Sequence, residues 1–113
     1  MENEKKLAES KLFTPYKLGS TTLRNRVIRS AAFESMGKDF APTQALKDYH
    51  VSVAKGGVGM TTVAYASINR SGISFNKQLW LRDEIVPALR DLTNAVHNEG
   101  AAVGIQLGHC GNM

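Results

Sequence analysis

Two stretches with the periodicity of amphipathic helices alternate with short apolar, β-branched runs, and this alternation constrains the fold more than any other feature of the chain. The first stretch follows Thr43, a residue type that caps helix N-termini, and ends at Gly56-Gly57. The second follows Asp83, another capping type, and ends at Gly100. Each helix has one apolar face, which we expect to be buried. The residues of these two faces are Leu46, Tyr49 and Val53, then Leu89, Leu92 and Val96.

Three runs predict strands: Val27 to about Ala32, Val58 to Ala64, and residues 101–107. The second and third runs are almost uninterrupted, as in strands buried on both faces of a parallel sheet. A short hairpin around Gly19-Ser20 precedes them. The resulting order is hairpin, β, α, β, α, β, which indicates an α/β fold with parallel strands. A doubly wound open sheet and the opening of a (β/α)8 barrel both fit, although no G-x-G-x-x-G fingerprint follows the first strand.

Composition narrows the class of protein. Residues 1–11 are polar and predict a disordered arm, so that 12–113 form the folded part. No run approaches the roughly 20 apolar residues of a membrane span, and no signal peptide or internal disulfide is expected, which favours the cytoplasm. The formal charge of +4 is scattered over the first half of the chain, so a solvated surface is favoured over nucleic-acid binding.

Active sites of parallel α/β folds gather where the strands end, and the third strand end carries the most candidate residues. Gln106 interrupts an apolar strand, and its amide can donate and accept hydrogen bonds, which suits a heterocycle with alternating N–H and C=O groups. The alternative is a Gln satisfied by neighbouring backbone. His109 and Cys110 follow, but no second Cys and no His spacing supports zinc. We therefore interpret His109 as a structural or pocket-lining residue.

For three further ionisable residues, the sequence favours surface or structural roles. His50 and His97 lie on the predicted helices, where a surface or helix-packing role is expected. Glu34, just past the first strand, could act as an acid or a base, but a solvated or Arg-paired carboxylate is the default interpretation.

A series of motifs runs in order over about residues 12–112. The motifs are Leu12-Phe13-x-Pro-x-x-Leu-Gly19, Leu23-Arg24-Asn25-Arg26, Arg29-Ser30-Ala31-Ala32-Phe33-Glu34, Lys55-Gly56-Gly57-Val58-Gly59, Trp80, Val96-His97-Asn98-Glu99-Gly100 and Gln106-Leu107-Gly108-His109-x-Gly111. Taken together, these motifs resemble the old yellow enzyme family of flavin-dependent NAD(P)H oxidoreductases.

The resemblance implies a (β/α)8 barrel that holds FMN at its C-terminal mouth and passes hydride from NADH or NADPH to an enone, an alkene or another small-molecule acceptor. It places Ser30, Ala31, Ala32 and Phe33 along the flavin ring, mainly through backbone. It places backbone of Tyr65 and the side chain of Gln106 on the flavin as well, the latter at the pyrimidine edge, and makes His109 a substrate-pocket candidate. Many members of that family have Thr or Cys where Phe33 stands here, and they usually have Arg where Asn112 stands.

A (β/α)8 barrel needs about 250 residues, whereas this chain has 113. We therefore expect the N-terminal portion of such a barrel, with three strands and two helices, and no catalytic residue is assigned. The alternative is a truncated, inactive βαβαβ module that self-associates. Homo-oligomer formation is left open, and neither nucleic acid nor a membrane is expected as a partner.

Overall fold

A computed structural model describes residues 2–111, apart from the side chains of residues 7 and 8. Its elements follow the predicted order of hairpin, β, α, β, α, β, with one helix and one short strand added. They are α1 (Glu2–Ala8), β1 (Tyr16–Leu18), β2 (Thr21–Leu23), β3 (Ile28–Arg29), α2 (Gln44–Lys55), β4 (Met60–Ser67), β5 (Leu79–Trp80), α3 (Val86–Asn98) and β6 (Ala102–Gly108). None of the described helices is long and apolar enough to cross a bilayer.

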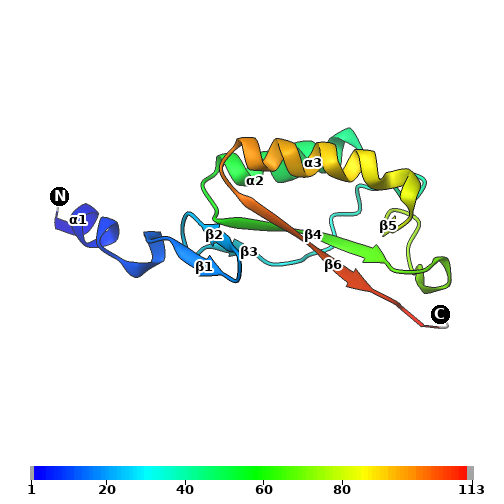
Figure 1. The fold of residues 1–113 in the computed structure, drawn as a ribbon, viewed down its shortest axis with the longest axis horizontal. Helices are drawn as coiled ribbons and strands as arrows, with labels where there is room; N and C mark the ends of the chain where they lie inside the picture. The colour runs from blue at the N-terminus through cyan, green and yellow to red at the C-terminus, as the bar shows by residue number, and fades with distance from the viewer. Residues whose placement is uncertain (1, 112–113) are drawn as a thin grey trace.

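The sheet is parallel and centres on β4. β3 pairs with the start of β4 and β5 with its end, while β6 pairs along the opposite edge of β4. Helices α2 and α3 lie side by side on one face of this sheet (Figure 1). Apart from the two-residue β5, successive strands therefore add in one direction with their helices on the same side. Consecutive units of a (β/α)8 barrel have this arrangement, and so does one half of a doubly wound sheet.

Helix α2 begins and ends where the sequence predicts. The Thr43 hydroxyl accepts a hydrogen bond from the backbone N–H of Leu46, and the helix ends at Gly56. The buried face differs from the predicted one, because Leu46, His50 and Ala54 are buried whereas Tyr49 and Val53 are only half-buried. These three buried residues are spaced four positions apart, and His50 is the middle one.

The N-terminus of α3 differs from the prediction. Asp83 does not cap it with its side chain, because residues 83–85 form a separate 3-10 turn and α3 begins at Val86. Pro87 lies in the first turn, where its missing N–H costs no helical hydrogen bond. Leu92 and Val96 are buried as expected.

The core lies between the two helices and the sheet. It consists of Leu46, Ala54, Val63, Ala66, Leu79, Leu92, Val96 and Ala101. β6 contributes less than expected. The sequence predicts a strand buried on both faces, but Leu107 is 54% exposed. Among the described residues β6 pairs with β4 alone, so one edge and part of its surface stay open.

Arg24 and Asn25 tie the hairpin to the end of the sheet where β4 begins. The Arg24 guanidinium donates to the backbone carbonyls of Ala54 (2.7 Å), Glu99 (2.9 Å) and Val58 (3.1 Å). Ala54 lies in the last turn of α2 and Glu99 directly follows α3, so one cation meets the negative ends of both helix dipoles. Arg24 and Asn25 of the Leu-Arg-Asn-Arg motif therefore stabilise the fold at the end of the sheet where the parallel strands begin.

The N-terminal segment forms a short helix where the sequence predicts a disordered arm. Glu2 and Glu4 lie in the first turn of α1, and Lys5 and Lys6 in its last, an order that complements the helix dipole. Figure 1 shows α1 standing away from the sheet, and an isolated helix of this length is marginal in water. Disorder of this arm in solution stays a prediction.

Candidate functional site

The predicted site residues lie at the end of the sheet where the parallel strands finish. Residues 30–33 follow β3 directly, Tyr65 lies near the end of β4, and Gln106 lies near the end of β6. The pairing of β4 with β6 is irregular between Val63 and Ala66, so that two β4 residues, one of them Tyr65, stand opposite Gln106. Such bulges re-aim side chains and are common beside active sites. The three segments share one rim.

The segment from residue 30 to residue 33 has no regular secondary structure. Ser30 and Ala32 are exposed, and the Phe33 side chain is 37% exposed. The Phe33 ring lies between two other aromatic rings, with centroids 5.1 Å from Tyr65 and 5.5 Å from Phe75. Backbone that is free of ladder hydrogen bonds and flanked by aromatic surface suits a planar, polar-edged ligand.

The Tyr65 side chain is held inside a neighbouring loop. Its hydroxyl donates to the Ser74 hydroxyl at 2.5 Å, and Ser74 donates to the Gln78 side-chain carbonyl at 2.9 Å. The same Gln78 oxygen accepts the backbone N–H of Ser74 and of Phe75, and Gln78 is buried. Because the Tyr65 hydroxyl is hydrogen-bonded to Ser74, we expect Tyr65 to contact a ligand through its backbone.

Gln106 is exposed, and its side-chain amide has no hydrogen-bond partner among residues 2–111. The alternative that neighbouring backbone satisfies this amide is therefore wrong for the described part of the chain. Both its donor and its acceptor are available at the rim.

His109 joins two loops at this end. Its Nδ1 accepts the backbone N–H of Gly111 at 3.0 Å, so the ring proton is on Nε2, which donates to the Ser71 hydroxyl at 3.1 Å. The ring packs so closely on Gly72 that a Cβ there would lie 2.5 Å from the His109 ring carbon Cδ2. These contacts agree with the structural interpretation of His109, and its place in a substrate pocket stays a prediction.

The structure contains a buried polar cluster that was not predicted from the sequence. Glu34 is Arg-paired, as the default interpretation expects, with Oε2 lying 3.6 Å from Arg29, but it also contacts His50 at 2.5 Å. The side chains of Glu34 and His50 are 1% and 0% exposed, so the predicted surface alternative for His50 is wrong. The signal in the sequence was the position of His50, four residues from both Leu46 and Ala54.

His97 is exposed on α3, away from the rim, and Asn112 lies outside the described residues. Within residues 2–111, no group of three or more His, Cys, Asp or Glu side chains is placed to hold a metal ion.

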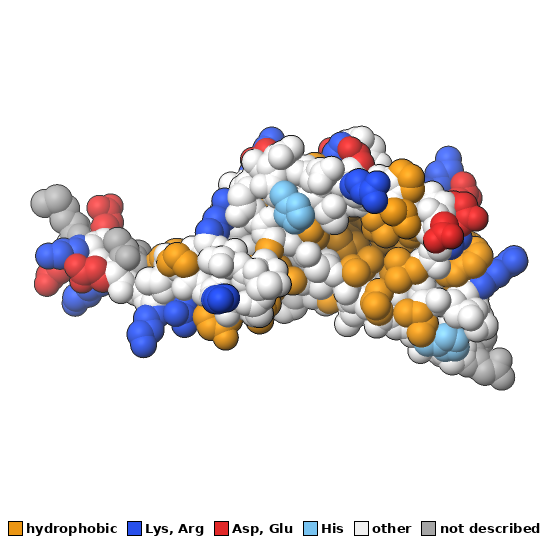
Figure 2. Space-filling view, viewed as in Figure 1, with side chains coloured by type: hydrophobic (Ala, Val, Ile, Leu, Met, Phe, Trp, Pro, Cys, Tyr) orange, Lys and Arg blue, Asp and Glu red, His pale blue; other side chains and the backbone are white. Residues whose placement is uncertain are grey.

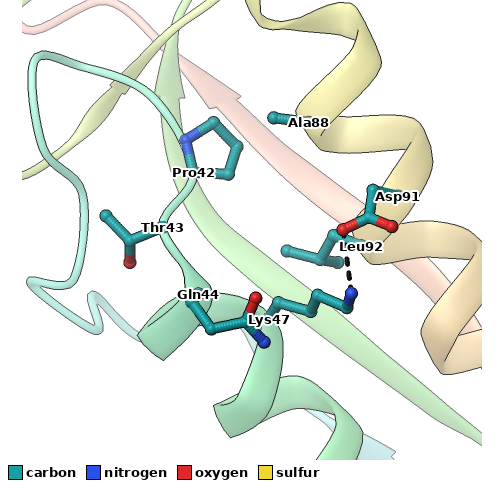
Figure 3. A pocket seen from close by; sticks show the side chains of 7 residues that line it. All are labelled: Pro42, Thr43, Gln44, Lys47, Ala88, Asp91 and Leu92. Atoms are coloured by element: carbon teal, nitrogen blue, oxygen red, sulfur yellow. Dashed lines mark hydrogen bonds and ion pairs between the residues drawn. The ribbon is translucent and has the colours of Figure 1, made fainter.

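Hollows elsewhere on the molecule do not contain the predicted site residues. Figure 3 shows one of about 110 Å³ between α2 and α3, where Lys47 and Asp91 point toward each other and pair at 2.9 Å. Figure 2 shows hydrophobic side chains gathered in a second hollow, which lies between α3 and β6 and has a volume of about 160 Å³. Both are smaller than the roughly 300–1,000 Å³ of typical ligand pockets.

Comparison with known proteins identifies relatives over almost the whole chain. The model of the NADH:flavin oxidoreductase / NADH oxidase family matches residues 11–113. The chain is 42% identical over 100 residues to the 4,4'-dithiodibutanoate disulfide reductase of Rhodococcus erythropolis, covering 88% of this chain and 25% of that protein. It is 39% identical over 106 residues to an NADPH dehydrogenase of Listeria welshimeri, covering 90% of this chain and 31% of that protein.

The solved structure of Old Yellow Enzyme from a Pichia species superposes with a TM-score of 0.84 at 22% identity, covering 91% of this chain and 27% of that one. This likeness confirms the predicted fold class, because the old yellow enzyme structures that superpose on this chain are (β/α)8 barrels. The chain corresponds to their N-terminal part. The chain thus spans about a quarter to a third of the length of these proteins.

Proposed function

Because the chain belongs to the NADH:flavin oxidoreductase / NADH oxidase family, we propose that it forms the N-terminal part of the FMN site of an oxidoreductase. In this proposal NADH or NADPH is the reductant, and an enone, an alkene or another small molecule is the acceptor. FMN supplies the redox chemistry, while the protein binds and orients it and sets its electrostatic surroundings. A cytoplasmic location goes with this proposal.

The observation that carries the proposal is the side-chain amide of Gln106 at the rim, which has no hydrogen-bond partner within the described part of the chain. The pyrimidine edge of a flavin alternates C=O and N–H groups, and a primary amide matches such an edge because it donates and accepts in one plane. Residues 30–33, of which all but Ala31 are exposed, lie at the same end of the sheet. Phe33, which has no hydroxyl or thiol, offers the ligand an aromatic surface without a side-chain hydrogen bond.

The test compares Gln106→Ala with Gln44→Ala in the product of the complete coding sequence that contains this chain. Gln44 is an exposed Gln on α2 that bonds Asp48 and lies outside the rim segments. FMN affinity is read from the quenching of flavin fluorescence. Loss of one to two hydrogen bonds should weaken FMN binding roughly tenfold in Gln106→Ala, with no change in Gln44→Ala. Equal affinity in both variants would remove Gln106 from the site, and a wild-type protein without FMN affinity would overturn the proposal.

The alternative of an inactive, self-associating βαβαβ module draws on a different observation. Among the described residues, β6 has one open edge beside the apolar hollow at α3, and open edges of this kind pair with other chains. Light scattering on the purified 113-residue chain distinguishes the two. A discrete dimer that has no affinity for FMN would favour the alternative, whereas a monomer would exclude it.

A further inference from the structure

The segment from Ser30 to Phe33 is fastened at both ends by charged side chains. Arg29 precedes it and Glu34 follows it, and these two side chains lie 3.6 Å apart in an ion pair. Both are largely removed from solvent, with Arg29 16% and Glu34 1% exposed. Because the segment has no ladder hydrogen bonds of its own, its conformation depends on what holds its two ends.

Glu34 connects the end of the segment to β4 and α2. Its carboxylate accepts the backbone N–H of Ala64 at 3.2–3.3 Å, beside the position where β4 bulges. It also accepts the Nε2–H of His50 at 2.5 Å. His50 is fully buried, and its Nδ1 lies 2.8 Å from the buried hydroxyl of Thr61 in β4.

Arg29 holds the beginning of the segment. Its guanidinium donates to the backbone carbonyl of Ala32 at 3.2 Å, which lies inside the segment, and to that of Thr62 at 2.7 Å in β4. It also bonds the Tyr49 hydroxyl of α2 and stacks on the Tyr49 ring at 4.9 Å. The rigid fork of a guanidinium permits all these bonds together, which the single ammonium of a lysine could not make.

Fold stability alone does not account for a buried charged cluster at this place. Taking charges out of water is costly, and apolar residues of similar volume often stabilise a core equally well. The specific contribution of these side chains is geometric: Arg29 and Glu34 reach from the ends of the segment to β4 and α2, and His50 reaches from α2 to Glu34 and β4.

We propose that Arg29, Glu34 and His50 are positioning residues that hold Ser30–Phe33 in the conformation that meets the flavin. This inference rests on the proposed function. It assigns a role to three side chains that need not touch the flavin themselves. Preorganisation of this kind lowers the entropy lost when a ligand binds.

The test uses Glu34→Gln in the product of the complete coding sequence, with Asp91→Asn as the matched control. Asp91 forms an ion pair with Lys47 between α2 and α3 and makes no contact with the segment. Both variants replace a carboxylate by its isosteric amide. In flavin-free protein, the NMR backbone order parameters of residues 30–35 should fall from about 0.85 toward about 0.6 in Glu34→Gln, while those of α3 stay unchanged. Asp91→Asn should leave residues 30–35 unchanged.

Two readouts with flavin then separate positioning from general stability. The dissociation constant of FMN should rise several-fold in Glu34→Gln, and the flavin midpoint potential should move toward that of free FMN, with neither change in Asp91→Asn. If Glu34→Gln does not fold, Arg29→Lys takes its place and is judged by the same measurements. That substitution keeps the positive charge but removes the branched guanidinium.

The outcomes are distinct. Wild-type protein that binds FMN, together with unchanged order parameters of residues 30–35 or unchanged FMN affinity in the deciding variant, overturns this inference alone. Order parameters that fall evenly over all elements also overturn it, because the cluster would then be merely structural. Wild-type protein that binds no FMN overturns the proposed function and this inference with it.

Discussion

Arg24→Met tests whether one side chain fastens the hairpin to both helices. The substitution keeps an unbranched apolar side chain and removes three hydrogen bonds, to Ala54, Val58 and Glu99. A hydrogen bond from a charged group contributes about 1.5–3 kcal/mol, but two of these three are exposed to solvent and count for much less. Only the bond to Ala54 is partly buried. We expect the free energy of unfolding to fall by about 2–3 kcal/mol.

The assay is urea unfolding followed by circular dichroism. With a slope of about 2 kcal/mol per molar urea, the expected loss lowers the midpoint by about 1–1.5 M. Arg90→Met is the matched control, because Arg90 is exposed on α3 and its side chain has no hydrogen bond or ion pair within residues 2–111. The control should stay within about 0.5 kcal/mol of wild type. Equal destabilisation by the two substitutions would refute the role given to Arg24.

Three further substitutions have expected outcomes. Gly59→Ala should destabilise the fold by about 1–3 kcal/mol in urea unfolding, because its Cβ would lie 2.4 Å from the backbone oxygen of Asn25; wild-type stability would contradict this. Leu92→Ala should cost about 2–5 kcal/mol by the same assay, since Leu92 is 1% exposed in the core, and a loss below about 1 kcal/mol would show a looser core. Gly72→Ala should displace the His109 ring and shift its nitrogen resonances in NMR spectra. Unshifted resonances would show that the ring does not pack against Gly72.

The elements that the sequence predicted well have local signals. Thr43 and Gly56 lie within a few residues of the ends of α2, and their effects on the helix are short-range. Asp83 had the same kind of signal, but a 3-10 turn separates it from α3, and no local pattern distinguishes this case. β5 was not predicted, because its two residues are held by pairing with the distant β4.

The site was predicted in part for the same physical reason. Gln106 could be recognised because a polar residue interrupts an apolar strand. Whether neighbouring backbone bonds its side-chain amide, however, depends on the tertiary structure around it, and no such bond forms within residues 2–111. The cluster of Glu34, Arg29 and His50 joins three elements through tertiary contacts. A histidine on a predicted helix has no local sign that a carboxylate from another segment will meet it.

The central claim is that the rim formed by residues 30–33, Tyr65 and Gln106 belongs to an FMN site. The most direct measurement is the flavin content of the complete gene product, purified without added flavin and analysed by its visible absorption and by identification of the released cofactor. We expect a yellow protein that releases FMN in amounts close to one per chain. A colourless protein that also fails to quench the fluorescence of added FMN would contradict it.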